Sequence, residues 1–85
     1  MSDLSEPVFP PELSHREFEV LRLLAWGFTY EEIAANLGVG RASVHTFRLR
    51  ATKKLKLESR HDLVRYAVNS GWFATEPSKR RRQNG

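Results

Sequence analysis

The segment from Gly38 to Lys56 constrains the fold of this chain more than any other part of its sequence. Two glycines stand at its start, and from Arg41 to Lys56 it holds six Lys or Arg residues and no Asp or Glu. Its apolar residues recur at the spacing of a helix with one buried side: Val44, Phe47, Ala51 and Leu55. A shorter amphipathic segment precedes the glycines. The sequence therefore predicts two helices joined by a tight turn, which is the arrangement of a helix-turn-helix.

The residues opposite the buried side of the second helix predict what that helix contacts. A helix that is apolar on one side and cationic elsewhere fits the major groove of DNA. The alternative is a solvated basic face that serves solubility only. The net charge of +4 and the isoelectric point near 10.0 favour a polyanionic partner, nucleic acid before an anionic membrane surface.

Length and composition exclude several classes of protein. With 85 residues the chain makes one small domain with little surplus stability, which a dimer or another partner would increase. It has no cysteine, so a disulfide framework and a thiolate metal site are excluded, and a reducing, cytoplasmic location is expected. No apolar run is long enough for a membrane span. The acidic, proline-rich start is not that of a signal peptide.

Capping signals divide the chain into four expected helices. Ser14, Thr29 and Ser59 each precede an acidic residue at the third helical position, as in a capping box. Gly27 and Gly71 are expected to end the first and last helices. The helices are expected to run from Ser14 to the cap at Gly27, from Thr29 to Leu37, from about Arg41 to Lys56, and from about Ser59 to Asn69 or Ser70. No strand pattern competes, so the fold class is all-α. Residues 1–12 are expected to form a flexible arm, residues 13–73 the domain, and residues 74–85 a disordered basic tail.

The recognition helix supplies most of the candidate DNA contacts. Its amino-terminal half is expected to read bases, because that half enters the groove first. The base contacts are expected from His45, Thr46 and Leu49. The phosphate contacts are expected from Thr29, Tyr30, Arg41, Ser43, Arg50, Lys53 and Lys54. Arg48 lies nearer the preceding helix and pairs equally well with an acidic side chain of the protein.

The last expected helix carries two apolar rows, and one row is enough for the core. The first row holds Leu63, Tyr66 and Ala67. The second holds Val64, Val68 and Trp72, and it either wraps around the core or forms a dimer interface. No catalytic constellation, metal-ligand spacing or cofactor motif is present, so the expectation is a protein that is not an enzyme and has no metal and no cofactor.

At this point the residues resemble a known family. Residues 13–21 follow the form L-[ST]-x-R-E-x-E-V-L, and residues 25–37 follow A-x-G-x-[ST]-x-x-E-I-A-x-x-L. The pairs at 43–44 and 54–55, with Arg60 and Gly71, complete the pattern of the LuxR/FixJ-type DNA-binding domain. The resemblance covers residues 13–73 without a gap. It departs from the family at Gly40, His45, Phe47 and Ala51, where Ser, a basic residue, His, and Ile or Met are usual.

The resemblance implies a four-helix domain with a three-helix core, a third helix that reads the major groove, and a fourth helix for dimerisation. Only twelve residues precede the domain, so the chain resembles the stand-alone members of the family, and a fragment of a longer protein is the alternative. The expected function is sequence-specific binding of double-stranded DNA by a small dimeric bacterial transcriptional regulator located at the nucleoid.

Two other readings remain open. Residues 29–34 and 43–55 are also similar to region 4 of bacterial sigma factors, which binds promoter DNA and RNA polymerase. The fourth helix, from Ser59 to Gly71, favours the LuxR-type domain. The alternative function is a protein-interaction module that forms a heterodimer with a larger regulator or binds RNA polymerase. Neutral His45, in place of a groove cation, is its best support.

Overall fold

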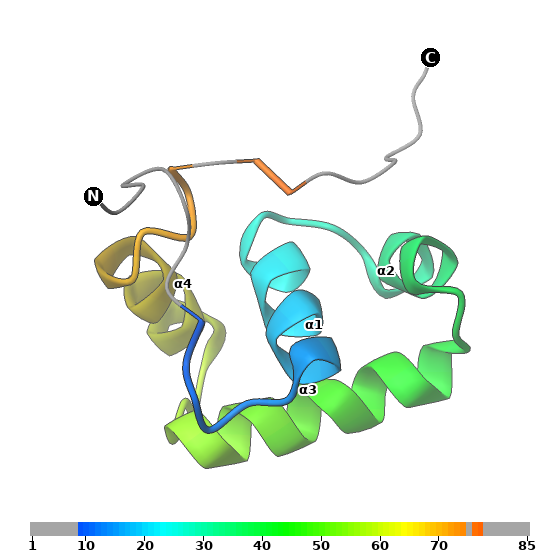
Figure 1. Ribbon diagram of the computed structural model, residues 1–85, viewed down its shortest axis with the longest axis horizontal. Helices are drawn as coiled ribbons and strands as arrows, with labels where there is room; N and C mark the ends of the chain where they lie inside the picture. The colour runs from blue at the N-terminus through cyan, green and yellow to red at the C-terminus, as the bar shows by residue number, and fades with distance from the viewer. Residues whose placement is uncertain (1–8, 75, 78–85) are drawn as a thin grey trace.

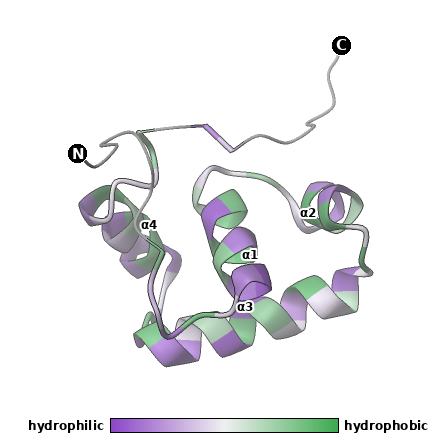
Figure 2. Cartoon of the chain, in the orientation of Figure 1, coloured by the Kyte–Doolittle hydropathy of each residue, from purple (hydrophilic) through white to green (hydrophobic). Residues whose placement is uncertain are grey.

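A computed structural model describes residues 9–74 and 76–77. Over this range the chain forms four helices and no strand, so the all-α prediction is confirmed. The helices are α1 (His15–Ala25), α2 (Tyr30–Leu37), α3 (Arg41–Leu55) and α4 (Arg60–Asn69). Helix α1 lies in the centre between α2 and α4, and α3 runs along one edge beneath it (Figure 1). The ribbon alternates between hydrophobic and hydrophilic residues around the helices, as helices with one buried side require (Figure 2).

Two of the three expected capping boxes are complete. The Ser14 hydroxyl accepts from the amide of Glu17, and the Glu17 carboxylate accepts from the amide of Ser14. Thr29 and Glu32 make the same pair of hydrogen bonds at α2. These bonds satisfy amides that the first turn of a helix leaves without a partner.

The box expected at α4 is only half formed. The Ser59 hydroxyl accepts from the amide of Asp62, but the Asp62 carboxylate accepts from the amide of Glu58 and not from that of Ser59. The φ angle of Ser59 is −148°, against −73° at Ser14 and −80° at Thr29. The backbone at Ser59 is therefore more extended than at the other two caps, and the Asp62 carboxylate binds the amide one residue earlier.

Left-handed residues end the helices around the turn and after α3. Gly38 has φ +71° and closes α2, which allows α3 to start three residues later in a new direction. Lys56 ends α3 with φ +58°, the one positive φ among the described residues other than glycine. The ends of α2 and α3 therefore lie where the sequence placed them, to within a residue.

The core is one cluster, with α1 at its centre. Leu21 and Val20 of α1, Ile33 of α2, and Val44 and Ala51 of α3 are fully buried. Of the other residues expected to face inward from α3, Phe47 and Leu55 are half-buried against the cluster. Leu63 and Ala67 bury the first row of α4 as expected. The Arg60 guanidinium donates to the carbonyl of Leu24, which joins the start of α4 to the end of α1.

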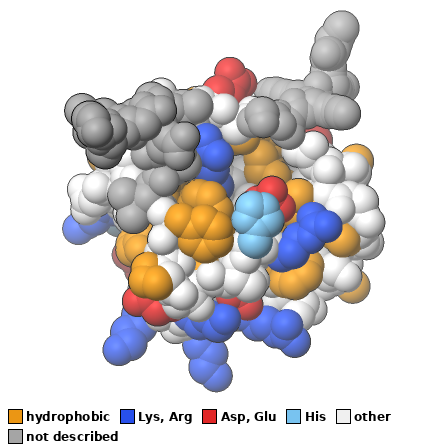
Figure 3. Space-filling model, viewed as in Figure 1, with side chains coloured by type: hydrophobic (Ala, Val, Ile, Leu, Met, Phe, Trp, Pro, Cys, Tyr) orange, Lys and Arg blue, Asp and Glu red, His pale blue; other side chains and the backbone are white. Residues whose placement is uncertain are grey.

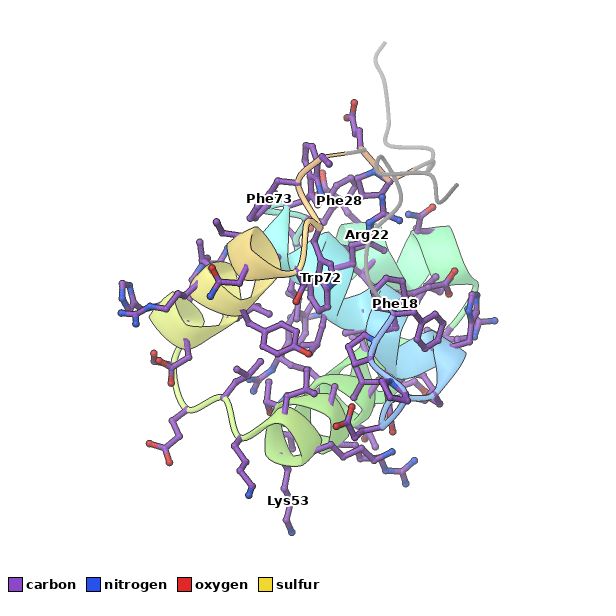
Figure 4. All side chains as sticks on the ribbon, turned by 60° about the vertical axis from the view of Figure 1, so that its left-hand side comes forward. Phe18, Arg22, Phe28, Lys53, Trp72 and Phe73 are labelled. Carbon is purple, nitrogen blue, oxygen red and sulfur yellow. The ribbon has the colours of Figure 1, made fainter. Side chains whose placement is uncertain are left out.

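Trp72 corrects the expected second row of α4. Its side chain is completely buried, with its ring edge-on to Phe18 at 5.3 Å and to Tyr66 at 5.4 Å between centroids. The expectation extended the helical spacing through residue 72, but α4 ends at Asn69 and Gly71 has φ +74°. The chain therefore turns back toward α1, and Trp72 points at Phe18 (Figure 4). The row available to a partner is reduced to Val64 and Val68.

The described part of the expected arm packs on α1. The ring of Phe9 stacks on Phe18 at 4.5 Å between centroids and lies 5.9 Å from the ring of His15. Pro10 is fully buried, and its carbonyl accepts from the amide of Leu13. Residues 1–8 and, apart from residues 74, 76 and 77, the expected basic tail lie outside the described residues.

Candidate nucleic-acid interface

One side of α3 is exposed along its whole length. Val44 and Ala51 on the opposite side are fully buried, which fixes the orientation of the helix about its axis. Every residue that the periodicity placed opposite the core is exposed. These residues form what is called here the outward face of α3: Arg41, Ala42, His45, Thr46, Leu49, Arg50 and Lys53.

The outward face is open and cationic. Helix α3 forms an edge of the molecule, with α1 and α2 packed on its other side (Figure 1). Lys and Arg side chains gather along that edge (Figure 3), and Lys53 extends away from the body of the domain (Figure 4). Leu49 is 48% exposed, so its apolar side chain is accessible to a partner. This surface can dock against a polyanion without rearrangement of the fold.

Lys54 has a partner inside the protein, in place of the phosphate expected for it. Its ammonium donates to Oε1 of Glu17 at 2.8 Å. Glu17 is buried, whereas the Lys54 side chain is 43% exposed. The same carboxylate oxygen accepts from the amide of Ser14 in the capping box. Lys54 therefore holds α3 against the start of α1, and its neighbour Lys53 is exposed on the outward face.

The surroundings of Glu17 keep its carboxylate ionised. Burial is the largest influence and alone would raise the pKa of Glu17. The hydrogen bond from Lys54, the amide of Ser14 and the positive charge of Arg50 act in the opposite direction, and together they lower the pKa below its ordinary value. Helical spacing could not predict this pair, because its two members are 37 residues apart.

The first turn of α2 lies beside the outward face. Thr29 is exposed, and its hydroxyl oxygen already accepts from the amide of Glu32, so only the hydroxyl proton is available to a phosphate. The Tyr30 hydroxyl accepts from Nε of Arg48 and lies 3.4 Å from Nδ1 of His45. Tyr30 is thus held between two residues of α3, and its expected phosphate contact stays a prediction. Arg48 pairs with this phenol, not with an acidic residue.

Arg41, at the start of α3, has local partners that water and ions can displace. Its Nε lies 3.4 Å from a carboxylate oxygen of Glu31, and its guanidinium carbon lies 5.9 Å from the centre of the Tyr30 ring. Both side chains of the ion pair are more than 60% exposed, and such pairs contribute at most about 1 kcal/mol. A phosphate can therefore replace Glu31 as the partner of Arg41.

One hollow adjoins the outward face and another lies on the other side of α3, and sequence reasoning identified neither. A shallow one of about 300 Å³ is lined by Ala42, Ser43, Thr46, Phe47 and Arg50. It brings half-buried Ser43 together with two expected contacts, Thr46 and Arg50. A second, of about 420 Å³, lies on the other side of α3. Its lining includes Tyr30, Arg48, Thr52 and Arg60.

Comparison with known proteins places this geometry in a family. Residues 11–67, which are more than half of the chain, match the model of the bacterial regulatory proteins of the luxR family. The chain belongs to the luxR family. The resemblance to this family is thereby confirmed, with the match ending at residue 67. The LuxR-family domain is a helix-turn-helix of DNA-binding transcription regulators, and α2, Gly38 and α3 form that motif here.

Several curated relatives share the LuxR-family domain. The chain is 42% identical over 60 residues to the uncharacterized response regulatory protein YgeK of Escherichia coli. It is 41% identical over 56 residues to the oxygen regulatory protein NreC of Staphylococcus carnosus, and 36% identical over 67 residues to the transcriptional regulatory protein MctR of Rhizobium johnstonii. These matches cover 71%, 66% and 79% of this chain.

The chain spans less than half the length of these relatives: 41% of YgeK, 26% of NreC and 29% of MctR. The comparison with solved structures gives no match. Over the described residues of the LuxR-family domain, no helix is long and apolar enough to cross a membrane.

Helix α4 of the LuxR-family domain keeps a small apolar surface away from α3. Val68 is 60% exposed and Val64, one turn earlier, is half-buried. Trp72, the third residue expected there, belongs to the core. The surface is smaller than the sequence indicated, and it is confined to one side of one helix.

Proposed function

We propose that this chain binds double-stranded DNA in a sequence-specific manner as a homodimer and regulates transcription, with α3 in the major groove. The observation that carries the proposal is the outward face of α3, which is exposed throughout and has no acidic residue. At 1.5 Å per residue, an α-helix of this length is about 22 Å long and about 10–12 Å across, which suits a groove about 12 Å wide. Membership of the luxR family supports the same partner.

The proposal gives separate roles to the residues of the outward face. Thr46 and Leu49 present methyl groups for thymine, and His45 presents a ring nitrogen to a base edge. Phosphate contacts come from the cations and hydroxyls around them, which fix the register of the helix: Thr29, Arg41, Ser43, Arg50 and Lys53. Lys54 and Tyr30 act within the protein, through Glu17 in one case and His45 in the other.

The homodimer is proposed from α4. Val68 and Val64 of one copy would pack against the same residues of a second copy about a two-fold axis. Two recognition helices related in this way read half-sites about one or more helical turns apart, which predicts a palindromic site. Because the apolar surface is small, the dimer is expected to form mainly on DNA.

The experiment begins with selection of bound duplexes from a random library, followed by titration of the recovered duplex at several salt concentrations. We expect a palindromic site and an affinity that falls steeply with salt, because each neutralised phosphate releases counterions. Arg50→Ala should weaken binding at least tenfold. Arg16→Ala is the matched control, since it removes one exposed arginine from α1 and leaves α3 unchanged.

Absence of binding to any duplex at low salt would overturn the proposal. In that event, sedimentation with RNA polymerase or with a larger LuxR-family regulator would test the alternative of a protein-interaction module. Equal losses for Arg50→Ala and Arg16→Ala would show non-specific attraction and not docking of α3.

A further inference from the structure

Three side chains from two helices meet beside the outward face of α3. Nε of Arg48 donates to the Tyr30 hydroxyl, and the same hydroxyl lies 3.4 Å from Nδ1 of His45. The Tyr30 and His45 rings are 6.1 Å apart and tilted by 47°. Tyr30 opens α2, whereas Arg48 and His45 lie on α3. Arg48 and Tyr30 are half-buried, and His45 is exposed.

The direction of these hydrogen bonds follows from the chemistry of the three groups. A guanidinium only donates, so the Tyr30 oxygen must be the acceptor toward Arg48. A phenol whose oxygen accepts from a cation becomes a stronger donor and a poorer acceptor, because hydrogen bonds in a chain polarise one another. Its proton is then best placed on Nδ1 of His45, which lies 3.4 Å from the hydroxyl oxygen. The order is Arg48 to Tyr30 to His45.

This order fixes the tautomer of a neutral histidine. An imidazole that accepts at Nδ1 must carry its proton on Nε2. Nε2 lies on the other side of the ring from Nδ1, and the ring is exposed on the outward face. We infer that Tyr30 and Arg48 hold His45 as the Nε2–H tautomer, so that His45 presents a hydrogen-bond donor to the major groove and reads guanine. The inference rests on the proposed function for its DNA partner.

Guanine is the base that a single outward donor recognises best. Its major-groove edge offers two acceptors, N7 and O6. Cytosine offers only an amino donor, which opposes a donor on the protein, whereas adenine and thymine each offer one acceptor, N7 and O4 respectively. A basic residue at this position also donates to guanine, but His45 in the other tautomer would present an acceptor and favour adenine or cytosine. The Tyr30 hydroxyl therefore determines the specificity of His45 without touching DNA itself.

The first test needs no DNA. Histidines labelled with ¹⁵N are observed by long-range ¹H–¹⁵N correlation at pH 8, and the ¹⁵N shifts themselves distinguish the two neutral tautomers from the charged form. In the wild type we expect the His45 signals of an unprotonated Nδ1 and a protonated Nε2. Tyr30→Phe removes only the hydroxyl, and we expect the fraction of Nδ1–H to rise. A proton on Nδ1 in the wild type, or ¹⁵N shifts that Tyr30→Phe leaves unchanged, would overturn the inference.

The second test uses the selected duplex, with 7-deazaguanine or adenine replacing each guanine in turn. We expect one position in each half-site where the replacement weakens wild-type binding about fivefold, the effect of one hydrogen bond of about 1 kcal/mol. His45→Ala and Tyr30→Phe should abolish that penalty. Tyr66→Phe, which removes a phenol hydroxyl from α4, is the matched control and should retain it.

The outcomes distinguish this inference from the proposed function. If duplexes bind with a clear sequence preference but Tyr30→Phe keeps every guanine penalty, the inference is wrong and the DNA-binding function stands. If no duplex binds, the proposed function fails, and with it the reading of guanine, whatever the tautomer. The inference is supported if Tyr30→Phe changes the tautomer of His45 and also abolishes the loss of affinity that follows replacement of one guanine.

Discussion

Replacing Lys54 by methionine should destabilise the domain, although Lys54 is an exposed residue of the cationic helix. Methionine keeps most of the aliphatic stem and removes the ammonium that bonds to Glu17 at 2.8 Å. The variant leaves a carboxylate buried with the Ser14 amide and the more distant charge of Arg50 as its remaining support. A buried charge that loses its partner is among the more costly changes in a protein.

The magnitude follows from the exposure of the two side chains. Breaking a fully buried ion pair costs about 3–5 kcal/mol. The Lys54 side chain is 43% exposed and that of Glu17 is 5% exposed, so water screens one member and not the other. We therefore expect the free energy of unfolding to fall by about 2 kcal/mol, roughly half the fully buried value. For a domain of this size the midpoint of thermal unfolding should fall by about 8–16 °C.

The assay is denaturant unfolding of the wild type, Lys54→Met, Glu17→Gln and the double variant, with Lys53→Met as control. Lys53 is exposed and neighbours Lys54, so Lys53→Met should change stability by less than about 0.5 kcal/mol. In the Glu17→Gln background, Lys54→Met should lower the free energy of unfolding only slightly, because a buried neutral amide does not need a cation beside it. Equal effects of Lys53→Met and Lys54→Met, or a coupling free energy near zero in the cycle, would refute the reasoning.

Acid should reduce the difference between the wild type and Lys54→Met. The pKa of Glu17 is lowered in the folded protein. Its ionised form therefore stabilises the fold at pH values above the ordinary pKa of a glutamate, about 4.3. That contribution is lost as the pH falls through the lower folded value. Without Lys54, burial dominates and the carboxyl takes up its proton at higher pH. The two proteins should therefore differ most near neutral pH and converge below the range in which Glu17 titrates.

Three further changes test other parts of the account. Lys53→Ala should weaken binding to all duplexes alike and reduce the slope of log affinity against log salt by about 0.9, as measured by fluorescence anisotropy. An unchanged slope would exclude a phosphate contact by Lys53. Val68→Asp should leave unfolding unchanged within about 0.5 kcal/mol, because Val68 is 60% exposed, yet abolish two-copy complexes on a palindromic duplex in sedimentation. Gly38→Ala should lower stability by about 1–2 kcal/mol in denaturant unfolding, since φ is +71°, and a neutral result would contradict the left-handed turn.

Local rules were enough to predict the helices and the orientation of α3. The capping boxes at Ser14 and Thr29 and the glycine at 38 depend on residues a few positions apart, and all three are confirmed. The outward face follows from helical periodicity once Val44 and Ala51 are placed in the core. Because these signals are local, the helices and the outward face could be predicted without knowing how the helices cross.

The same local rules could not predict contacts between residues that are far apart in the sequence. The partner of Lys54 is on α1, and that of Arg48 and His45 is on α2, so both depend on how the helices cross. Trp72 was placed on the wrong side because helical periodicity was extended past the end of α4. The sequence therefore predicted which residues lie on the surface of α3 better than it predicted which of them are available to DNA.

The central claim is that the outward face of α3 is the surface that binds DNA. Backbone amide chemical shifts of the ¹⁵N-labelled chain, measured while the selected duplex is added, test it most directly. The account predicts that the largest changes lie at residues 45–53 and in the first turn of α2, with smaller changes around Val68 where two copies meet. Changes confined to α4 or to the arm around Phe9, with residues 45–53 unaffected, would contradict it.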